Sequence, residues 1–160
     1  MKLKIDHWAT KEYHFDRSPQ MPDYWKNLTN ALAVSIEKFT KYPSSKWDAQ
    51  GGIVNFYSLK DSLTAHQDRS ELNETAPLMS FSFGNSAVFL MGSKSLETEP
   101  TPILLESGDI IILSGESRRN FHSLPRVIGN TCQLKFRDEE LNNYMSETRI
   151  NVNIRQVHIS

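Results

Sequence analysis

The segment that most constrains the fold is residues 149–155, where polar and apolar side chains alternate over seven positions. This alternation is typical of a β-strand, because successive side chains of a strand point to opposite faces of the sheet. The polar face carries Arg149, Asn151, Asn153 and Arg155. If that face points inward, two guanidinium groups are partly buried and require anionic partners. An exposed face with solvated arginines is the alternative, and the pattern alone leaves both open.

Short segments rich in branched and aromatic residues predict further strands at 53–57, 78–83, 87–90, 103–105 and 110–113. Residues 107–109, Ser-Gly-Asp, predict a hairpin turn between the last two strands. A helix after Pro22 that ends before Pro43 is predicted to pack on a sheet, although its apolar face could instead bind a partner; that face comprises Tyr24, Leu28, Leu32, Ile36 and Phe39. The predicted fold class is therefore α+β, mainly β: a double-sheet jelly roll with a supporting N-terminal helix.

Composition limits the functional classes. The 160 residues, without internal repeat or linker, predict a single domain over 1–160. No apolar run approaches the ~18 residues of a membrane span, so we expect no membrane partner. Cys132 is the only cysteine, which favours a reducing, intracellular compartment, whether nucleus, cytoplasm or mitochondrion. The net charge of −1 lacks the basic excess of proteins that hold long nucleic acids by charge alone, so any such contact needs a local patch, a further segment or a partner.

A His-x-Asp pair is the first candidate for chemistry. His66 and Asp68 stand two residues apart, so in extended backbone both project from one face and can converge on one point. A third ligand must come from elsewhere, and His122, which follows the predicted strand 110–113, could supply it. Two histidines and one carboxylate with open positions form the facial triad of non-haem Fe(II) oxygenases. Taken singly, each histidine is better explained as an ordinary surface or core residue, and only the combination favours a metal site.

The polar strand face complements such a metal. A dicarboxylate could chelate iron through one carboxylate while a planar guanidinium binds the other carboxylate bidentately. Asn55 and Tyr57, two residues apart on another predicted strand, could add neutral hydrogen bonds.

Taken together, these segments resemble the AlkB family of Fe(II)/2-oxoglutarate dioxygenases, in order and in spacing, from about Trp8 to Val157. The matching stretches are 55–57, 66–71, 77–84, 107–109, 115–118, His122 and 149–155; residues 68–72 (DRSEL) and 78–84 (LMSFSFG) look most like the AlkB homologue 1 branch. The resemblance implies a double-stranded β-helix, iron ligated by His66, Asp68 and His122, and 2-oxoglutarate bound with Arg149 at its metal-side carboxylate and Arg155 at its distal one. The co-substrate pocket would be completed by Asn55, Tyr57 and Asn151.

The resemblance also implies contacts with a nucleic-acid base, which would involve Trp8, Tyr13, Ser70, Glu71 and Arg118. Several relatives have an acidic residue where this chain has Ser70, a departure that argues against simple transfer of alkylated-DNA repair. Trp8 could equally be a core residue, and Arg118 a surface charge. Family members normally carry a longer region ahead of the Trp8 segment, so residues 1–50 are expected to supply only part of the nucleotide-recognition lid, with residues 51–160 forming the catalytic core.

The function implied is oxidative demethylation, or hydroxylation, of a methylated base with Fe(II), 2-oxoglutarate and O₂. RNA such as tRNA is favoured over DNA, and the base must be unpaired or flipped out. Two alternatives remain: a 2-oxoglutarate-dependent hydroxylase or demethylase of protein side chains, and a binding module that keeps the fold without turnover. The oligomeric state is left open.

Overall fold

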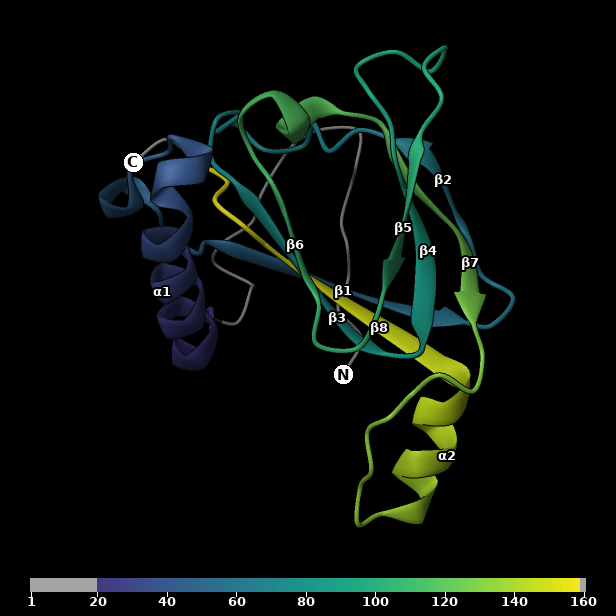
Figure 1. Ribbon diagram of the computed structural model, residues 1–160. Coiled ribbons are helices and arrows are strands. Elements are labelled where there is room, and N and C mark those ends of the chain that lie inside the picture. The colour runs from purple at the N-terminus through teal and green to yellow at the C-terminus, as the bar shows by residue number, and fades with distance from the viewer. Residues whose placement is uncertain (1–19, 159–160) are drawn as a thin grey trace.

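Two four-stranded sheets make up the centre of the computed structural model, which describes residues 20–158 (Figure 1). The first sheet has the order β1 (Gly51–Ser58), β8 (Thr148–Arg155), β3 (Leu78–Gly84) and β6 (Ile110–Leu113). The second has the order β2 (Leu63–His66), β7 (His122–Ile128), β4 (Ser86–Met91) and β5 (Thr101–Leu105). Neighbouring strands run antiparallel in both sheets. This is the jelly roll that the alternating and apolar segments predict.

The alternating strand β8 lies between β1 and β3, and its two faces have different surroundings. Val152 and Ile154 on the apolar face belong to the main hydrophobic core. The polar face looks into the space between the sheets, where its four polar side chains line a cavity. The open question of which way this face points is therefore answered: it points inward, because the apolar face is covered by a helix.

That helix is α1 (Asp23–Thr40), which covers the outer face of the first sheet (Figure 1). The prediction of the helix is confirmed, but its packing face is rotated by about one residue. Tyr24, Leu28 and Phe39 are exposed, whereas the sheet is contacted by Trp25, Leu32, Ala33 and Ile36. Trp25 packs edge-on against Phe81 of β3 with ring centroids 4.9 Å apart. These positions are spaced as one helical stripe, and a small residue, Ala33, lets the helix approach the sheet closely.

The predicted hairpin at residues 107–109 is wrong. β5 pairs with β4 in the second sheet and β6 pairs with β3 in the first, so the turn carries the chain from one sheet to the other. Gly108, with φ of +100°, provides the left-handed backbone at this crossing, and its N–H donates to Ser82 O at 2.8 Å. Two apolar runs joined by a tight turn have the same sequence pattern whether the two strands pair with each other or each pairs with a strand of a different sheet.

Sequence patterns missed the two strands that carry the histidines, β2 and β7, and a second helix, α2 (Glu139–Glu147). Asp138 caps α2 by accepting from the N–H of Leu141 at 3.2 Å. Buried Asn85 donates to three carbonyls, among them Ser146 O and Thr148 O, and so anchors the junction from which β8 starts. Two short 3₁₀ helices, η2 (Ser44–Lys46) and η3 (Gly115–Arg119), complete the described elements.

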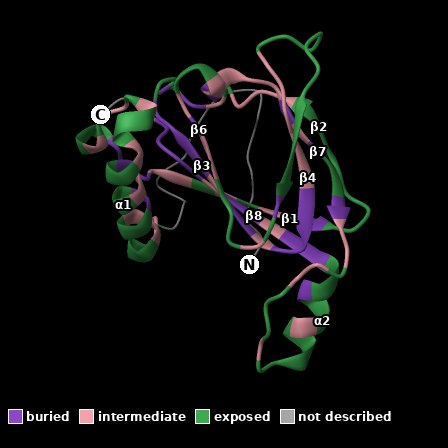
Figure 2. Cartoon of the chain, in the orientation of Figure 1, coloured by how far each residue is buried: buried purple, intermediate pink, exposed green. Residues whose placement is uncertain are grey.

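Burial follows this layering: β3 and β8 are mostly buried, β1 alternates between buried or half-buried residues and exposed ones, and α1 is exposed along its outer side (Figure 2). Within residues 20–158, none of the helices combines the length and the apolar character that crossing a bilayer would require.

Candidate metal centre and adjoining cavity

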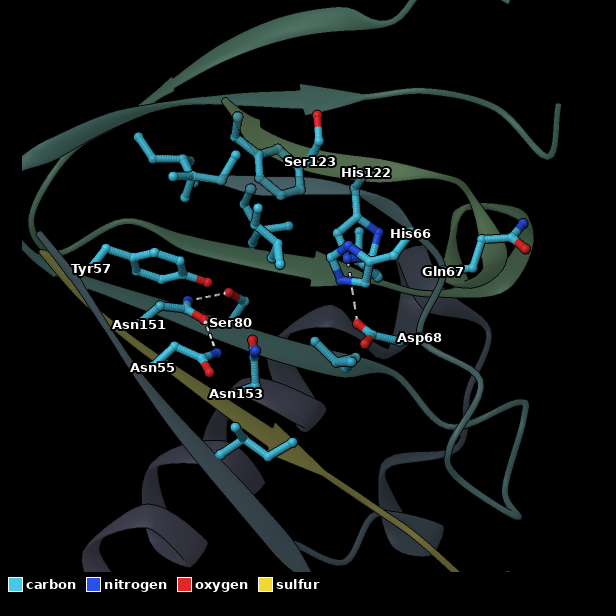
Figure 3. A pocket seen from close by; sticks show the side chains of 18 of the residues that line it. Asn55, Tyr57, His66, Gln67, Asp68, Ser80, His122, Ser123, Asn151 and Asn153 are labelled. Atoms are coloured by element: carbon cyan, nitrogen blue, oxygen red, sulfur yellow. Dashed lines mark hydrogen bonds and ion pairs between the residues drawn. The ribbon is translucent and has the colours of Figure 1, made fainter. Parts of the chain in front are cut away.

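Three side chains distant in sequence converge between the sheets. His66 is the last residue of β2, His122 is the first of β7, and the two are cross-strand partners. Asp68 reaches the same point from the loop that follows β2. One ligand atom of each residue lies within 4.8 Å of the others, and Nε2 of His122 is 3.5 Å from Oδ2 of Asp68. Figure 3 shows the three side chains directed toward one another.

Backbone carbonyls orient both imidazoles. Nδ1 of His66 is 2.9 Å from Thr64 O, and Nδ1 of His122 is 3.1 Å from Asn120 O. A carbonyl oxygen only accepts, so each Nδ1 donates to it, and each Nε2 is the ring nitrogen left to face the centre. A hydrogen bond from the far ring nitrogen is the usual way in which proteins orient a metal-binding histidine. Two imidazole nitrogens and one carboxylate on one side of a site fit Fe(II) with open coordination positions.

Electrostatics keep the Asp68 carboxylate ionised. Burial acts to raise its pKa, but a hydrogen bond from His122 and the nearby charge of Arg155 outweigh burial and hold the pKa of Asp68 well below its usual range. The carboxylate is therefore available as an anionic ligand at neutral pH.

A cavity of about 320 Å³ opens beside the three residues, between the inner faces of the two sheets. That volume falls at the small end of ligand pockets, which span roughly 300–1,000 Å³, and suits a small co-substrate. One wall is polar and comes from the first sheet: Asn55, Tyr57, Ser80, Arg149, Asn151, Asn153 and Arg155. The opposite wall is largely apolar and includes Leu63, Phe89, Leu105 and Leu124.

The two arginines of β8 occupy opposite ends of this cavity and differ in their partners. Arg155 donates to Oδ1 of Asp68 at 3.1 Å and to Oε1 of Glu71 at 2.5 Å, so it lies at the metal end. Arg149 is six residues earlier, about 20 Å along an extended strand. We expected Arg149 beside the metal and Arg155 at the far end; the contacts place them the other way round, because β8 runs toward Asp68 at its carboxyl end.

Arg149 is a buried cation without a counter-ion among the residues that the structure describes. Its side chain is 0% exposed, and its guanidinium donates only to neutral acceptors, Ser82 Oγ at 2.9 Å and Asn85 O at 3.2 Å. Its Nε has no hydrogen-bond partner, and no ion pair is formed with any carboxylate of residues 20–158. Burial lowers the pKa of Arg149, and the nearby Tyr57 and Asp109 oppose that shift. A buried guanidinium in such surroundings requires an anion that the described residues do not supply.

The middle of the cavity carries neutral polar groups. Asn151 donates to Ser80 Oγ at 2.7 Å and to Phe81 O at 3.2 Å, and accepts from Nδ2 of Asn55 at 3.4 Å (Figure 3). Tyr57 is cross-strand to Arg149, and burial raises the pKa of its phenol, which remains a neutral hydrogen-bond donor. Asn55, Tyr57 and Asn151 thus lie where the sequence placed them, on the polar wall.

Of the residues expected to contact a base, the three that the structure describes do not line the cavity. Trp8 and Tyr13 lie outside the described residues. Glu71 and Arg118, each 3% exposed, are buried against one another at 2.8 Å and do not line the cavity. Ser70 donates to Glu71 and accepts from Arg155. A buried carboxylate and guanidinium satisfy each other, so a contact of Glu71 or Arg118 with substrate does not agree with this arrangement.

Sequence reasoning gave no role to several polar residues that line the cavity, among them Gln67, Ser80 and Asn153. Asn153 lies on the polar face of β8, and Ser80 is its cross-strand partner on β3. Extending the period-two argument from β8 to its neighbour would have found Ser80. Gln67, inside the His-x-Asp pair, donates to Arg119 O at 2.5 Å, a contact that no local pattern indicates.

The jelly roll, the His-Asp-His centre and the buried arginine facing it across a small cavity define the class of 2-oxoglutarate-dependent iron oxygenases. The chain belongs to this class: the model of the 2OG-Fe(II) oxygenase superfamily matches residues 3–155.

Curated relatives narrow the resemblance. The tRNA demethylase abh1 of Schizosaccharomyces pombe is 37% identical over 156 residues, covering 96% of this chain and 50% of its own. The nucleic acid dioxygenase ALKBH1 of Homo sapiens is 41% identical over 125 residues, covering 77% and 30%. The DNA N(6)-methyladenine demethylase ALKBH1A of Arabidopsis thaliana is 31% identical over 166 residues, covering 94% and 48%. The chain thus spans half or less of the length of these relatives.

The solved structure of OsALKBH1 superposes with a TM-score of 0.66 and 26% identity, over 86% of this chain and 65% of that one. The predicted likeness to the AlkB homologue 1 branch and the predicted jelly roll are both confirmed by these matches.

Proposed function

We propose that this chain is the catalytic core of an Fe(II)- and 2-oxoglutarate-dependent oxygenase that demethylates a nucleic-acid base, with RNA preferred. The observation that carries the proposal is the pair formed by a His-Asp-His centre and the unpaired buried Arg149 across one cavity. A metal site alone would suit many reactions. The buried guanidinium of Arg149 at the other end of the cavity requires a ligand with an anionic group remote from the metal. A dicarboxylate has such a group.

In this proposal His66, Asp68 and His122 would hold the iron and leave coordination positions open for the co-substrate. Arg155 orients the Asp68 ligand, and Arg149 binds the distal carboxylate of 2-oxoglutarate, with Tyr57 as a neutral donor beside it. When bound, iron and 2-oxoglutarate supply a two-electron oxidation of a C–H bond by O₂, with succinate and CO₂ released. The apolar wall opposite excludes water from the reacting groups.

Hydroxylation of a methyl carbon on a base nitrogen gives a hemiaminal, which breaks its C–N bond and releases formaldehyde and the unmodified base. A base inside a duplex could not reach a centre between two sheets, so the substrate base is unpaired or flipped out. Of the two relatives named above that align over more than nine-tenths of the chain, the tRNA demethylase is 37% identical and the DNA demethylase 31% identical, and this difference favours RNA. With a net charge of −1, binding by this chain should show only a shallow dependence on salt.

The test is a turnover screen with Fe(II) and 2-oxoglutarate on three pools: methylated RNA, methylated DNA and peptides. Succinate reports co-substrate use, while formaldehyde and the mass of each polymer identify the reaction. We expect loss of methyl groups from RNA and no succinate from Asp68→Ala. Products that gain oxygen in the peptide pool would replace this proposal with a protein hydroxylase. Absence of succinate despite bound metal would replace it with a binding module.

A further inference from the structure

A buried ion pair, Glu71 with Arg118, connects the two parts of the chain that carry the candidate metal ligands. Glu71 lies in the loop after β2, three residues beyond Asp68, and Arg118 lies in η3, four residues before His122. The carboxylate and guanidinium are 2.8 Å apart, and both side chains are almost completely buried. We call this pair the Glu71–Arg118 bridge.

Arg118 donates hydrogen bonds from all three of its guanidinium nitrogens to the loop after β2. Besides Glu71, it donates from Nη1 to Asp68 O at 3.0 Å and from Nε to Ala76 O at 3.1 Å. A single side chain therefore binds the backbone of Asp68, a candidate ligand, and the backbone of Ala76 at the far end of the same loop. Such a planar, multidentate hold is available to arginine and not to lysine.

Glu71 is connected to the carboxylate of Asp68 through Arg155. Its second oxygen, Oε1, accepts from Arg155 at 2.5 Å, and Arg155 also donates to Oδ1 of Asp68 at 3.1 Å. Both oxygens of Glu71 are therefore used by guanidinium groups, one on each side. The result is a continuous chain of charged contacts from η3 to the carboxylate beside the imidazoles.

The strand ladder by itself does not fix the centre. β2 and β7 are matched at His66 and His122, but their register shifts between Leu63 and His66. Asp68 lies beyond the end of β2, in a loop outside regular secondary structure. Side-chain contacts must therefore hold Asp68 in place relative to His122.

We propose that Glu71 and Arg118 are positioning residues that set Asp68 against His122 and so preorganise the metal centre. This role rests on the proposed metal site and replaces the expectation that the two residues contact a substrate base. Residues behind metal ligands usually contribute through orientation, and losing one typically weakens metal binding by about 10- to 100-fold.

Cobalt affinity of the full chain tests this role without turnover. Co(II), a spectroscopic substitute for Fe(II), is titrated into metal-free wild type, Glu71→Gln and Arg118→Lys in competition with a chromophoric chelator. Circular dichroism sets conditions under which each metal-free protein is folded. The matched control is Glu74→Gln, in the same loop, whose carboxylate is exposed and pairs with Arg119.

We expect Glu71→Gln to weaken cobalt binding by about 10- to 100-fold and to alter the visible spectrum of the bound ion, with Glu74→Gln like wild type. Arg118→Lys, which keeps the charge but loses the multidentate hold, should weaken binding in the same direction, and it carries the test if Glu71→Gln fails to fold. Folded variants that bind cobalt with wild-type affinity and spectrum would overturn the positioning role alone. A wild type that binds no cobalt would overturn the proposed function as well.

Discussion

Replacing Arg149 with methionine should separate co-substrate binding from fold stability, because no carboxylate within residues 20–158 forms an ion pair with the buried guanidinium. Arg155→Met is the matched control: it is the same substitution on the same face of β8, but Arg155 is paired with Asp68 and Glu71. Arg149 has no carboxylate partner among the described residues, whereas Arg155 is already paired with two carboxylates of the chain. We therefore expect the two variants to fail in different ways.

The magnitudes follow from these partners. Hydrogen bonds to charged groups contribute about 1.5–3 kcal/mol each, so losing a bidentate pair to a carboxylate weakens 2-oxoglutarate binding by ~3–6 kcal/mol, or about 10²- to 10⁴-fold. In the unliganded protein, Arg149→Met removes two hydrogen bonds but also a desolvated charge, and we expect the free energy of unfolding to change by no more than about 1 kcal/mol. Breaking the buried pairs of Arg155 should cost about 3–5 kcal/mol.

Two measurements check this contrast. Calorimetry with 2-oxoglutarate, using Mn(II) in place of Fe(II), gives the co-substrate affinity of each variant. Urea denaturation of the metal-free proteins gives the free energy of unfolding. The reasoning would be refuted if Arg149→Met bound 2-oxoglutarate as tightly as wild type, or if it destabilised the unliganded fold as much as Arg155→Met does.

Three further outcomes are expected. Asp68→Ala should abolish detectable Co(II) binding in the competition titration, because two imidazoles alone hold the metal poorly; retained affinity would remove Asp68 from the ligand set. Burial acts to raise the pKa of Glu71, but Arg155 and Arg118 outweigh burial and lower that pKa. The ionised form of Glu71 therefore stabilises the fold at pH values above the ordinary glutamate pKa of ~4.3. This contribution to stability is lost as the pH falls toward the lower pKa of the folded state. Urea denaturation between pH 3 and 7 should therefore show the gap between wild type and Glu71→Gln shrinking in acid, and a constant gap would contradict the ion-pair account. Met79→Ala, at a fully buried core position under α1, should cost about 2–5 kcal/mol of stability without changing 2-oxoglutarate affinity, since Met79 is not among the cavity-lining residues; calorimetric unfolding and binding measure the two effects separately.

Local patterns were sufficient for the strands with regular alternation and for the existence of α1. The alternation in residues 149–155 placed Arg149, Asn151, Asn153 and Arg155 on one face, and the structure keeps them there along the cavity wall. The boundaries of α1 followed from Pro22 and Pro43, but its packing face did not. More than one face of this helix carries apolar residues that could pack on a sheet. The face that packs contains Trp25 and Ala33, and Trp25 contacts Phe81 of the sheet.

Patterns failed where strands were short or interrupted. β2 has four residues, exposed over most of its length, so no apolar run marked it. β7 contains Pro125 in its interior, which argues against a strand when only the sequence is considered. The segment 107–109 was correctly predicted as a turn, but pairing between strands is a property of the whole sheet and is not encoded in the turn.

By itself, then, the sequence determined the type of fold, the two-sided character of β8 and the residue types available for a metal and a diacid, because these depend on spacing within a few residues. Tertiary structure alone decided that the polar side of β8 faces inward, since α1 covers its apolar side. It also decided that Arg155, and not Arg149, lies beside Asp68, and that Glu71 and Arg118 face each other. Each of these outcomes depends on where segments about 50 to more than 100 residues apart meet, and contacts over such separations have no local signature.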